Sequence, residues 1–126
     1  MSGAICACGS GRTYASCCGQ FHAGAAAPDA ESLMRSRYSA YVLGLQAYLL
    51  ATWHPATRPA ALELETPPRT QWLGLAVKSH TPMDGRHAKV EFVARYKLNG
   101  RAFKLHDTSR FERVDGHWLY VDGEIG

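Results

Sequence analysis

All four cysteines of this 126-residue chain lie close together near its N-terminus, as Cys6, Cys8, Cys17 and Cys18. A zinc ion bound by four thiolates holds them in a tetrahedron at about 2.3 Å, and two close pairs joined by a short loop can supply such a set. Gly9-Ser10-Gly11 allows a sharp turn after the first pair, because glycine tolerates positive φ. The spacing predicts one closed, structural zinc site, since protein ligands take every coordination position.

Disulfides, an iron centre and a redox dithiol are the alternatives to zinc. With Met1 taken as the start, the N-terminal stretch lacks the basic and apolar regions of a secretory signal peptide. We therefore expect a cytoplasmic protein, in a reducing compartment where clustered cysteines bind metal rather than one another. His22 is an alternative ligand, although a loop histidine without a metal role is the simpler interpretation.

The pattern Cys-x-Cys-Gly-Ser-Gly-x-x-Tyr-x-x-Cys-Cys over residues 6–18 resembles the SEC-C motif. This zinc knuckle is found at the carboxyl end of the SecA translocation ATPase and in many small proteins. In SecA the last ligand is often histidine, so Cys18 makes this the all-cysteine variant. The SecA knuckle contacts the export chaperone SecB, and the resemblance therefore implies a protein-interaction role for residues 1–22 without identifying the partner.

Length and composition fit one soluble domain behind the knuckle. Hydrophobic residues make up 46% of the chain and charged residues 20%, as in ordinary globular proteins. The longest apolar run is much shorter than a membrane span, so we expect no membrane-spanning segment. The net charge of +3 is scattered without a basic block, which does not favour nucleic acid as a partner.

The first half of the remaining chain carries helical signals. Residues 23–28 are rich in glycine and alanine without periodicity and are expected to form a linker. Asp29 is typical of a helix N-cap and Gly44 of a helix end, with apolar residues between them at three- and four-residue steps. The polar face of this helix would consist of Arg35, Ser36 and Arg37.

A second helix is expected over residues 45–52 and a short helical segment over residues 60–65. From Trp72 onwards the period changes to two, which predicts strands. The later strands are expected over residues 88–97, 102–114 and 118–121. Hairpin turns are predicted at Asn99-Gly100 and Asp115-Gly116. Helices followed by a four-stranded antiparallel meander predict an α+β fold.

Several segments spread over nearly the whole chain resemble the YchJ-like family of small bacterial proteins, which join a SEC-C knuckle to an NTF2-like domain. The segments are residues 33–38, 52–55, 72–75, 92–96, 109–111 and 116–123. The resemblance implies an NTF2-like cone over residues 29–126, in which two or three helices pack on the concave side of a curved four-stranded sheet. It implies no particular reaction.

NTF2-like cones often enclose an apolar pocket, and Asp107 is the residue best suited to chemistry there. Strand parity places Asp107 on the same face as Leu105 and Phe111, where an apolar interior would raise the pKa of its carboxyl group. A structural ion pair with an arginine and outward orientation through a β-bulge are the alternatives. The other candidate pocket residues are Trp53, His54, Arg95 and Tyr120.

No nucleophile elbow or phosphate-binding loop is recognisable in the sequence. The leading hypothesis is therefore a non-enzymatic zinc-binding protein whose knuckle contacts a protein partner. A small-ligand-binding protein or enzyme that uses the interior of the cone is the alternative. Since the knuckle and the cone are predicted to be separate units, Cys8→Ser would unfold the knuckle alone.

Overall fold

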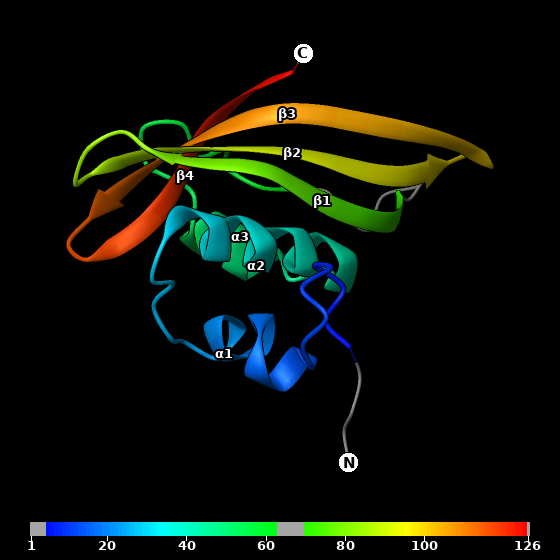
Figure 1. Ribbon diagram of the computed structural model, residues 1–126, viewed down its shortest axis with the longest axis horizontal. Coiled ribbons are helices and arrows are strands. Elements are labelled where there is room, and N and C mark those ends of the chain that lie inside the picture. Colours follow the sequence, from blue (N-terminus) through cyan, green and yellow to red (C-terminus); the bar gives the residue numbers. More distant parts are fainter. Residues whose placement is uncertain (1–4, 63–69, 126) are drawn as a thin grey trace.

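The computed structural model describes residues 5–62 and 70–125, which form three layers (Figure 1). A twisted sheet forms the first layer, two helices beneath it form the second, and the cysteine-rich N-terminal segment forms the third. The helices are α1 (Cys18–His22), α2 (Ala30–Leu43) and α3 (Gln46–Ala51), preceded by a 3-10 turn at Tyr14–Ser16. The strands are β1 (Gln71–Pro82), β2 (His87–Leu98), β3 (Arg101–Val114) and β4 (His117–Ile125).

The sheet is the antiparallel meander that the sequence predicts, with strand order β1-β2-β3-β4. Both expected hairpin turns are present, and each places an Asn or Asp and the following Gly at positive φ. The φ angles are 52° at Asn99 and Asp115 and 79° at Gly100 and Gly116. These angles suit two-residue turns whose twist matches that of the strands. The α+β order of elements is thereby confirmed.

Helix α2 begins and ends at the expected residues. The Asp29 side chain accepts a hydrogen bond from the backbone N–H of Ser32 at 2.7 Å, which satisfies one free donor of the first turn. Gly44 adopts the left-handed conformation with φ 74°, and the backbone N–H of Leu45 donates to the Ala40 carbonyl at 2.8 Å. This closure is the usual glycine-dependent end of a helix.

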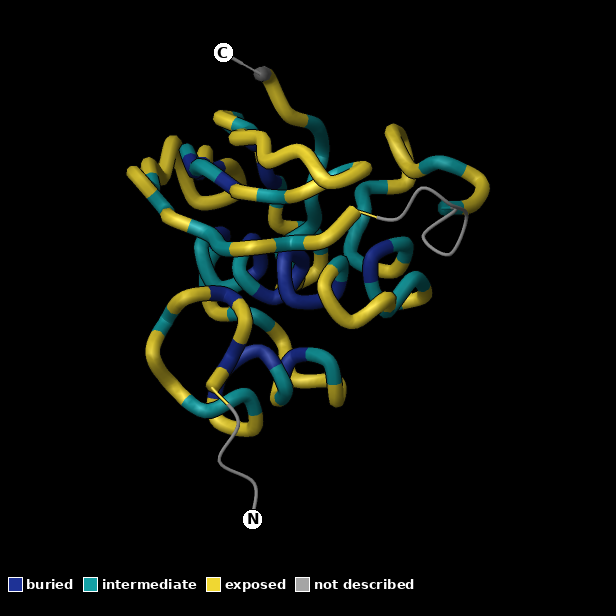
Figure 2. Tube along the Cα trace, turned by 90° about the vertical axis from the view of Figure 1, so that its right-hand side faces the viewer, coloured by how far each residue is buried: buried dark blue, intermediate teal, exposed yellow. Residues whose placement is uncertain are grey.

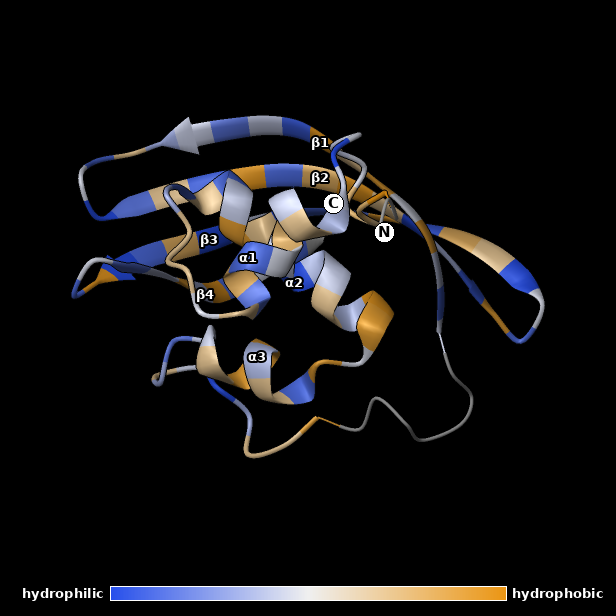
Figure 3. Ribbon diagram, turned by 90° about the horizontal axis from the view of Figure 1, so that it is seen from below, coloured by the Kyte–Doolittle hydropathy of each residue, from blue (hydrophilic) through white to orange (hydrophobic). Residues whose placement is uncertain are grey.

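The expected polar face of α2 is wrong for two of its three residues, because α2 is the middle layer and has neighbours on opposite sides. Ser36 and Arg37 are buried, while Arg35 is partly exposed. Figure 2 shows the buried residues concentrated around this central layer. From the knuckle side, α1 lies over α2, with the sheet behind them (Figure 3). Helix α2 therefore connects the cysteine-rich segment to the sheet.

The segment after α3 runs beside the last strand. The His54 backbone N–H donates to the Tyr120 carbonyl at 2.7 Å, and the Tyr120 N–H donates to the Thr52 carbonyl at 2.8 Å. Residues 60–62 are not helical, and the rest of the expected 60–65 helix lies outside the described residues. Among the helices of the described ranges, none has the length and apolar character needed to cross a membrane.

Candidate metal centre

Backbone turns bring the two cysteine pairs together. The Cys6 N–H donates to the Arg12 carbonyl at 2.8 Å, which closes the loop that carries the first pair. Within that loop Gly9 and Gly11 both have φ of 84°, a conformation that glycine adopts without strain. A Cβ on Gly9 would also lie 2.9 Å from the Leu75 carbonyl oxygen, so the loop approaches β1 more closely than another residue would allow. The second pair lies at the start of α1.

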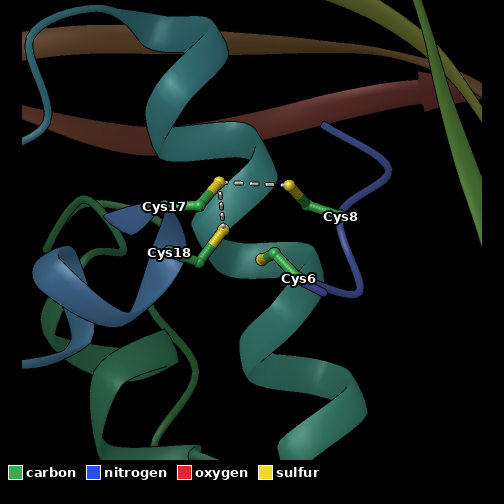
Figure 4. Close-up of side chains that lie close together, drawn as sticks. All are labelled: Cys6, Cys8, Cys17 and Cys18. Atoms are coloured by element: carbon green, nitrogen blue, oxygen red, sulfur yellow. Dashed lines mark hydrogen bonds between the residues drawn. The ribbon is translucent and has the colours of Figure 1, made fainter. Parts of the chain in front are cut away.

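The four sulfur atoms form a compact buried cluster (Figure 4). All of them lie within 4.8 Å of one another, with 3.6 Å between the Sγ atoms of Cys8 and Cys17 and 4.0 Å between those of Cys17 and Cys18. Tetrahedral zinc with sulfur at about 2.3 Å requires separations of about 3.8 Å, whereas a disulfide requires about 2.05 Å. The cysteines are free thiols at most 3% exposed. Their geometry fits a tetrahedral four-sulfur metal site.

The electrostatics of the cluster favour a bound cation. A hydrogen bond from Cys18 lowers the pKa of Cys8 to about 4, and the same contact with Cys8 raises the pKa of Cys18. Burial raises the pKa of Cys17. Without a positive ion the cluster therefore stabilises one thiolate at the expense of its neighbours, because several negative sulfurs would lie together away from water. A divalent ion would remove this repulsion and would hold all four cysteines as thiolates.

Residues of the loop and of α2 support the sulfurs from outside. The Ser10 Oγ lies 3.2 Å from the Cys17 Sγ, and the Ser39 Oγ lies 3.4 Å from the Cys6 Sγ. The Arg35 guanidinium donates to the Cys8 carbonyl at 2.8 Å, which brings a positive charge to the edge of the cluster. Such contacts orient the ligands of a metal site and moderate their charge.

His22 is bound to protein groups through both ring nitrogens. The Tyr14 hydroxyl donates to Nδ1 at 2.6 Å, and Nε2 donates to the Ser36 carbonyl at 2.8 Å. Because a carbonyl oxygen can only accept, Nε2 carries the proton in the second of these bonds. His22 therefore links α1 to α2 and lies outside the group of side chains that could hold a metal.

Comparisons with known proteins identify both parts of the chain. Residues 4–20 match the SEC-C motif, and residues 29–123 match the family described as YchJ, middle NTF2-like domain. The chain belongs to the YchJ-like family. The family resemblance and the fold expected from the sequence are thus confirmed. The match at residues 4–20 contains the whole four-cysteine cluster.

Relatives and solved structures cover nearly the full YchJ-like chain. A UPF0225 protein of Ralstonia nicotianae is 59% identical over 97% of this chain and 92% of its own length. A UPF0225 protein of Bordetella parapertussis is 55% identical over 98% of this chain and 95% of its own length. The solution structure of a SEC-C motif containing protein from Rhodopseudomonas palustris has a TM-score of 0.83 at 34% identity, covering 94% of this chain and 96% of that one. A crystal structure of a SEC-C motif containing protein from Psychrobacter arcticus has a TM-score of 0.79 at 31% identity. The match covers 96% of this chain and 82% of that one.

The YchJ-like domain contains a cavity of about 280 Å³ between α2 and the sheet. Of the candidate pocket residues, Asp107 and Tyr120 line it. Arg95 is exposed, because strand parity directs it away from the face occupied by Phe92 and Ala94. His54 lies 3.0 Å from a carboxylate oxygen of Glu112, outside the lining.

Trp53 also lies outside the cavity lining but packs behind it. Its ring covers one side of the Arg37 guanidinium at 4.9 Å from the centroid, and the Tyr120 ring covers Arg37 at 4.6 Å. Arg37 donates to the Leu49 carbonyl at 2.8 Å and itself lines the cavity. The sequence pattern predicts Arg37 on the polar face of α2, and this expectation is wrong. The signal that could have found it is its four-residue spacing from Leu33 and Tyr41, which places it on a buried stripe.

Asp107 faces the cavity from β3, as strand parity predicts. The β-bulge in this part of the sheet lies at the β3–β4 pairing, between Arg110 and Phe111, and does not turn Asp107 outward. The Asp107 Oδ1 is buried without a hydrogen-bond partner, and burial raises the pKa of the carboxyl group, opposed mainly by the Glu124 amide. Among the described residues Asp107 forms no ion pair, so the arginine partner considered from the sequence is not found there.

Proposed function

We propose that this YchJ-like protein holds one structural zinc ion through Cys6, Cys8, Cys17 and Cys18, and that the knuckle so formed contacts a protein partner in a reducing bacterial cytoplasm. The four buried sulfurs within 4.8 Å of one another carry the proposal. Zinc accepts a tetrahedral set of four thiolates without redox chemistry. Because the protein supplies every ligand, no coordination position remains for water, and the role is structural rather than catalytic.

The exposed surface of the knuckle supports the partner proposal. One side of the knuckle is used internally, through the contacts of Cys6, Cys8 and His22 with α2. On the exposed remainder, Ile5 leaves 63% of its surface accessible, beside the exposed Arg12. An apolar side chain next to a basic one is a common composition of protein contact surfaces.

Cobalt substitution tests the coordination. Tetrahedral Co²⁺ with four thiolates absorbs strongly in the visible region, and replacement of one sulfur changes the spectrum. We expect the wild-type protein to show the four-sulfur spectrum and Cys18→Ser to alter it. His22→Gln should leave the spectrum unchanged, since both ring nitrogens already bond to protein groups. A His22→Gln spectrum with a changed ligand set, or octahedral cobalt in the wild-type protein, would refute the four-cysteine site.

Matched surface variants test the partner. Ile5→Ser changes the exposed apolar residue of the knuckle, and Met83→Ser changes a similarly exposed one, at 57%, after β1. Affinity capture from bacterial extract, with zinc content checked for each variant, should recover a protein with wild type and Met83→Ser and lose it with Ile5→Ser. Equal recovery by all three proteins would exclude the proposed contact surface while leaving the zinc site untouched.

A further inference from the structure

The cavity between α2 and the sheet combines aromatic walls with a few polar groups. Its apolar lining comes from α2 and from the sheet. The apolar and aromatic lining residues include Met34, Tyr38, Trp72, Phe92, Leu105 and Phe111. The Trp72 ring lies 5.7 Å from that of Tyr38 and 5.6 Å from that of Tyr96, with tilted or edge-on geometry. Flat aromatic molecules fit such walls through stacked and edge-to-face contacts.

The volume limits the size of an occupant. A cavity of ~150 Å³ lined by apolar side chains admits benzene. In proportion, the cavity of about 280 Å³ accommodates a compact molecule of roughly eleven non-hydrogen atoms. This corresponds to one substituted ring or two fused rings. A larger ligand such as a nucleotide or a steroid would extend out of the cavity into solvent.

The charges on the cavity wall favour a neutral occupant. Burial lowers the pKa of Arg37 to about 10, so its guanidinium remains positive at neutral pH. The Asp107 carboxylate lines the same cavity, while Arg37 donates to the Leu49 carbonyl and the Thr52 hydroxyl. An anionic ligand would meet Asp107 and a cationic ligand would meet Arg37, each in a poorly solvated space.

Asp107 supplies a specific recognition point. Its Oδ1 is shielded from solvent and accepts no hydrogen bond from the residues that the structure describes. A Cβ on Gly123 would lie 2.7 Å from this oxygen, so the carboxylate fits here only because residue 123 has no side chain. A carboxylate in a poorly solvated wall costs free energy, and a ligand that donates a hydrogen bond to the part of the group that lines the cavity recovers some of this cost on binding. Burial and the neighbouring Asp107 raise the pKa of Tyr120 to about 12, so Tyr120 keeps its hydroxyl proton beside the site.

We propose that the cavity binds a neutral, flat aromatic molecule of one or two rings that donates a hydrogen bond, from a hydroxyl or a ring N–H, to the carboxylate of Asp107. The aromatic residues of α2 and the sheet enclose its rings, and Asp107 determines its orientation. This binding site is on the opposite side of α2 from the cysteine cluster. The proposal is independent of the identity of the metal and of any partner of the knuckle.

Three related compounds test the proposal on the full-length, metal-loaded protein. 2-Naphthol carries the donor, 2-methylnaphthalene has the same shape without it, and 2-naphthoate adds a negative charge. Titration calorimetry at neutral pH should give 2-naphthol a dissociation constant on the order of 10–100 µM. We expect binding at least about ten-fold weaker for 2-methylnaphthalene, which lacks the hydrogen bond, and weaker still for 2-naphthoate.

Two variants locate the binding. Asp107→Leu replaces the carboxylate by an apolar group of similar size, and should reduce the preference for 2-naphthol over 2-methylnaphthalene to less than about two-fold. Ala94→Leu fills the cavity from β2, where Ala94 is 1% exposed, and should abolish binding of both compounds. The outward-facing Arg95→Ala is the matched control on the same strand and should bind like wild type. Circular dichroism and metal content verify that each variant is folded.

Equal affinity of the wild-type protein for the donor and the methyl analogue would overturn the role of Asp107. Undiminished 2-naphthol binding by the folded Ala94→Leu protein would place the ligand outside the cavity and overturn the site. Absence of 2-naphthol binding up to its solubility limit would overturn the proposed ligand class. None of these results would affect the cobalt spectrum that tests the zinc site.

Discussion

At the residue scale, the buried polar side chains define what the sheet side of α2 can do. Arg37 is stacked between two aromatic rings and donates to the Leu49 carbonyl and the Thr52 hydroxyl. The Arg37 side chain therefore connects the end of α3 to β4, and it also lines the cavity. The sequence predicts the direction of Asp107, because strand parity is local. It did not reveal the burial of Arg37, because that depends on a tertiary environment in which aromatic rings and carbonyl oxygens replace water.

The raised pKa of Asp107 leads to a pH-dependent prediction for the ligand-free protein. Since the folded-state pKa lies above the unfolded one, ionisation of Asp107 reduces stability as pH rises through the folded-state value. Asp107→Asn keeps the shape without the charge. We expect the variant to be more stable than wild type by up to about 1 kcal/mol at pH 8, with the difference shrinking towards acid pH. The difference in unfolding free energy builds up between the unfolded-state and the folded-state pKa, so urea unfolding of both proteins from pH 8 down to about pH 3.5 measures it.

Asp122→Asn is the control for the Asp107 prediction. The Asp122 carboxylate accepts a hydrogen bond from Arg110, which lowers the pKa of Asp122. Loss of the carboxylate charge in Asp122→Asn should therefore destabilise the protein, and more so at high pH. A stability difference for Asp107→Asn that stays constant with pH, or one of the opposite sign, would contradict the buried state of Asp107.

At the element scale, the sequence predicts helix ends and hairpin turns correctly where single residues determine the backbone conformation. Asp29 and Gly44 determine the two ends of α2, and Asn99-Gly100 determines one hairpin. The helix content of the knuckle was not predicted, because a five-residue helix such as α1 is stabilised by its contacts with α2 rather than by its own sequence pattern. The cavity likewise depends on how side chains of separate elements meet, which no local pattern encodes.

The end of α2 offers a test of this local encoding. Gly44→Ala places a Cβ at φ 74°, and we expect a loss of about 1 kcal/mol of unfolding free energy. Gly85→Ala is the control, since no atom of the described residues lies within 4 Å of its added Cβ and its φ is not positive. Urea unfolding should show no more than about 0.3 kcal/mol of change for the control. Equal effects of the two substitutions would show that Gly44 has no special role.

At the scale of the whole molecule, the knuckle and the NTF2-like domain share one core. The buried cysteines belong to the same hydrophobic cluster as Leu33, Tyr38 and Val90. His22, Arg35 and Ser39 add polar contacts across the boundary. The sequence-based expectation that Cys8→Ser would unfold the knuckle alone assumed two separate units. With a shared core, we expect metal loss to weaken α2 and the sheet as well.

Metal removal tests this coupling. A chelator-treated sample should unfold at a temperature at least about 10 °C lower than the metal-loaded protein, because structural zinc contributes several kcal/mol to folding. Tryptophan fluorescence, which reports on Trp72 and Trp118 in the sheet and on Trp53 beside β4, should follow the same single transition as far-UV circular dichroism. Added Zn²⁺ should restore the original midpoint. An unchanged tryptophan transition after metal loss would show that the two parts are independent.

The measurement that tests the central claim most directly is the metal content of the native protein, purified without chelator, together with a count of reactive thiols. Native mass spectrometry should show one zinc ion per chain. A thiol reagent should find no accessible cysteine until a chelator is added, and then all four. A metal-free chain with four freely reactive thiols would contradict the zinc site. It would also contradict the inference that a metal ion bound by the four cysteines stabilises α2.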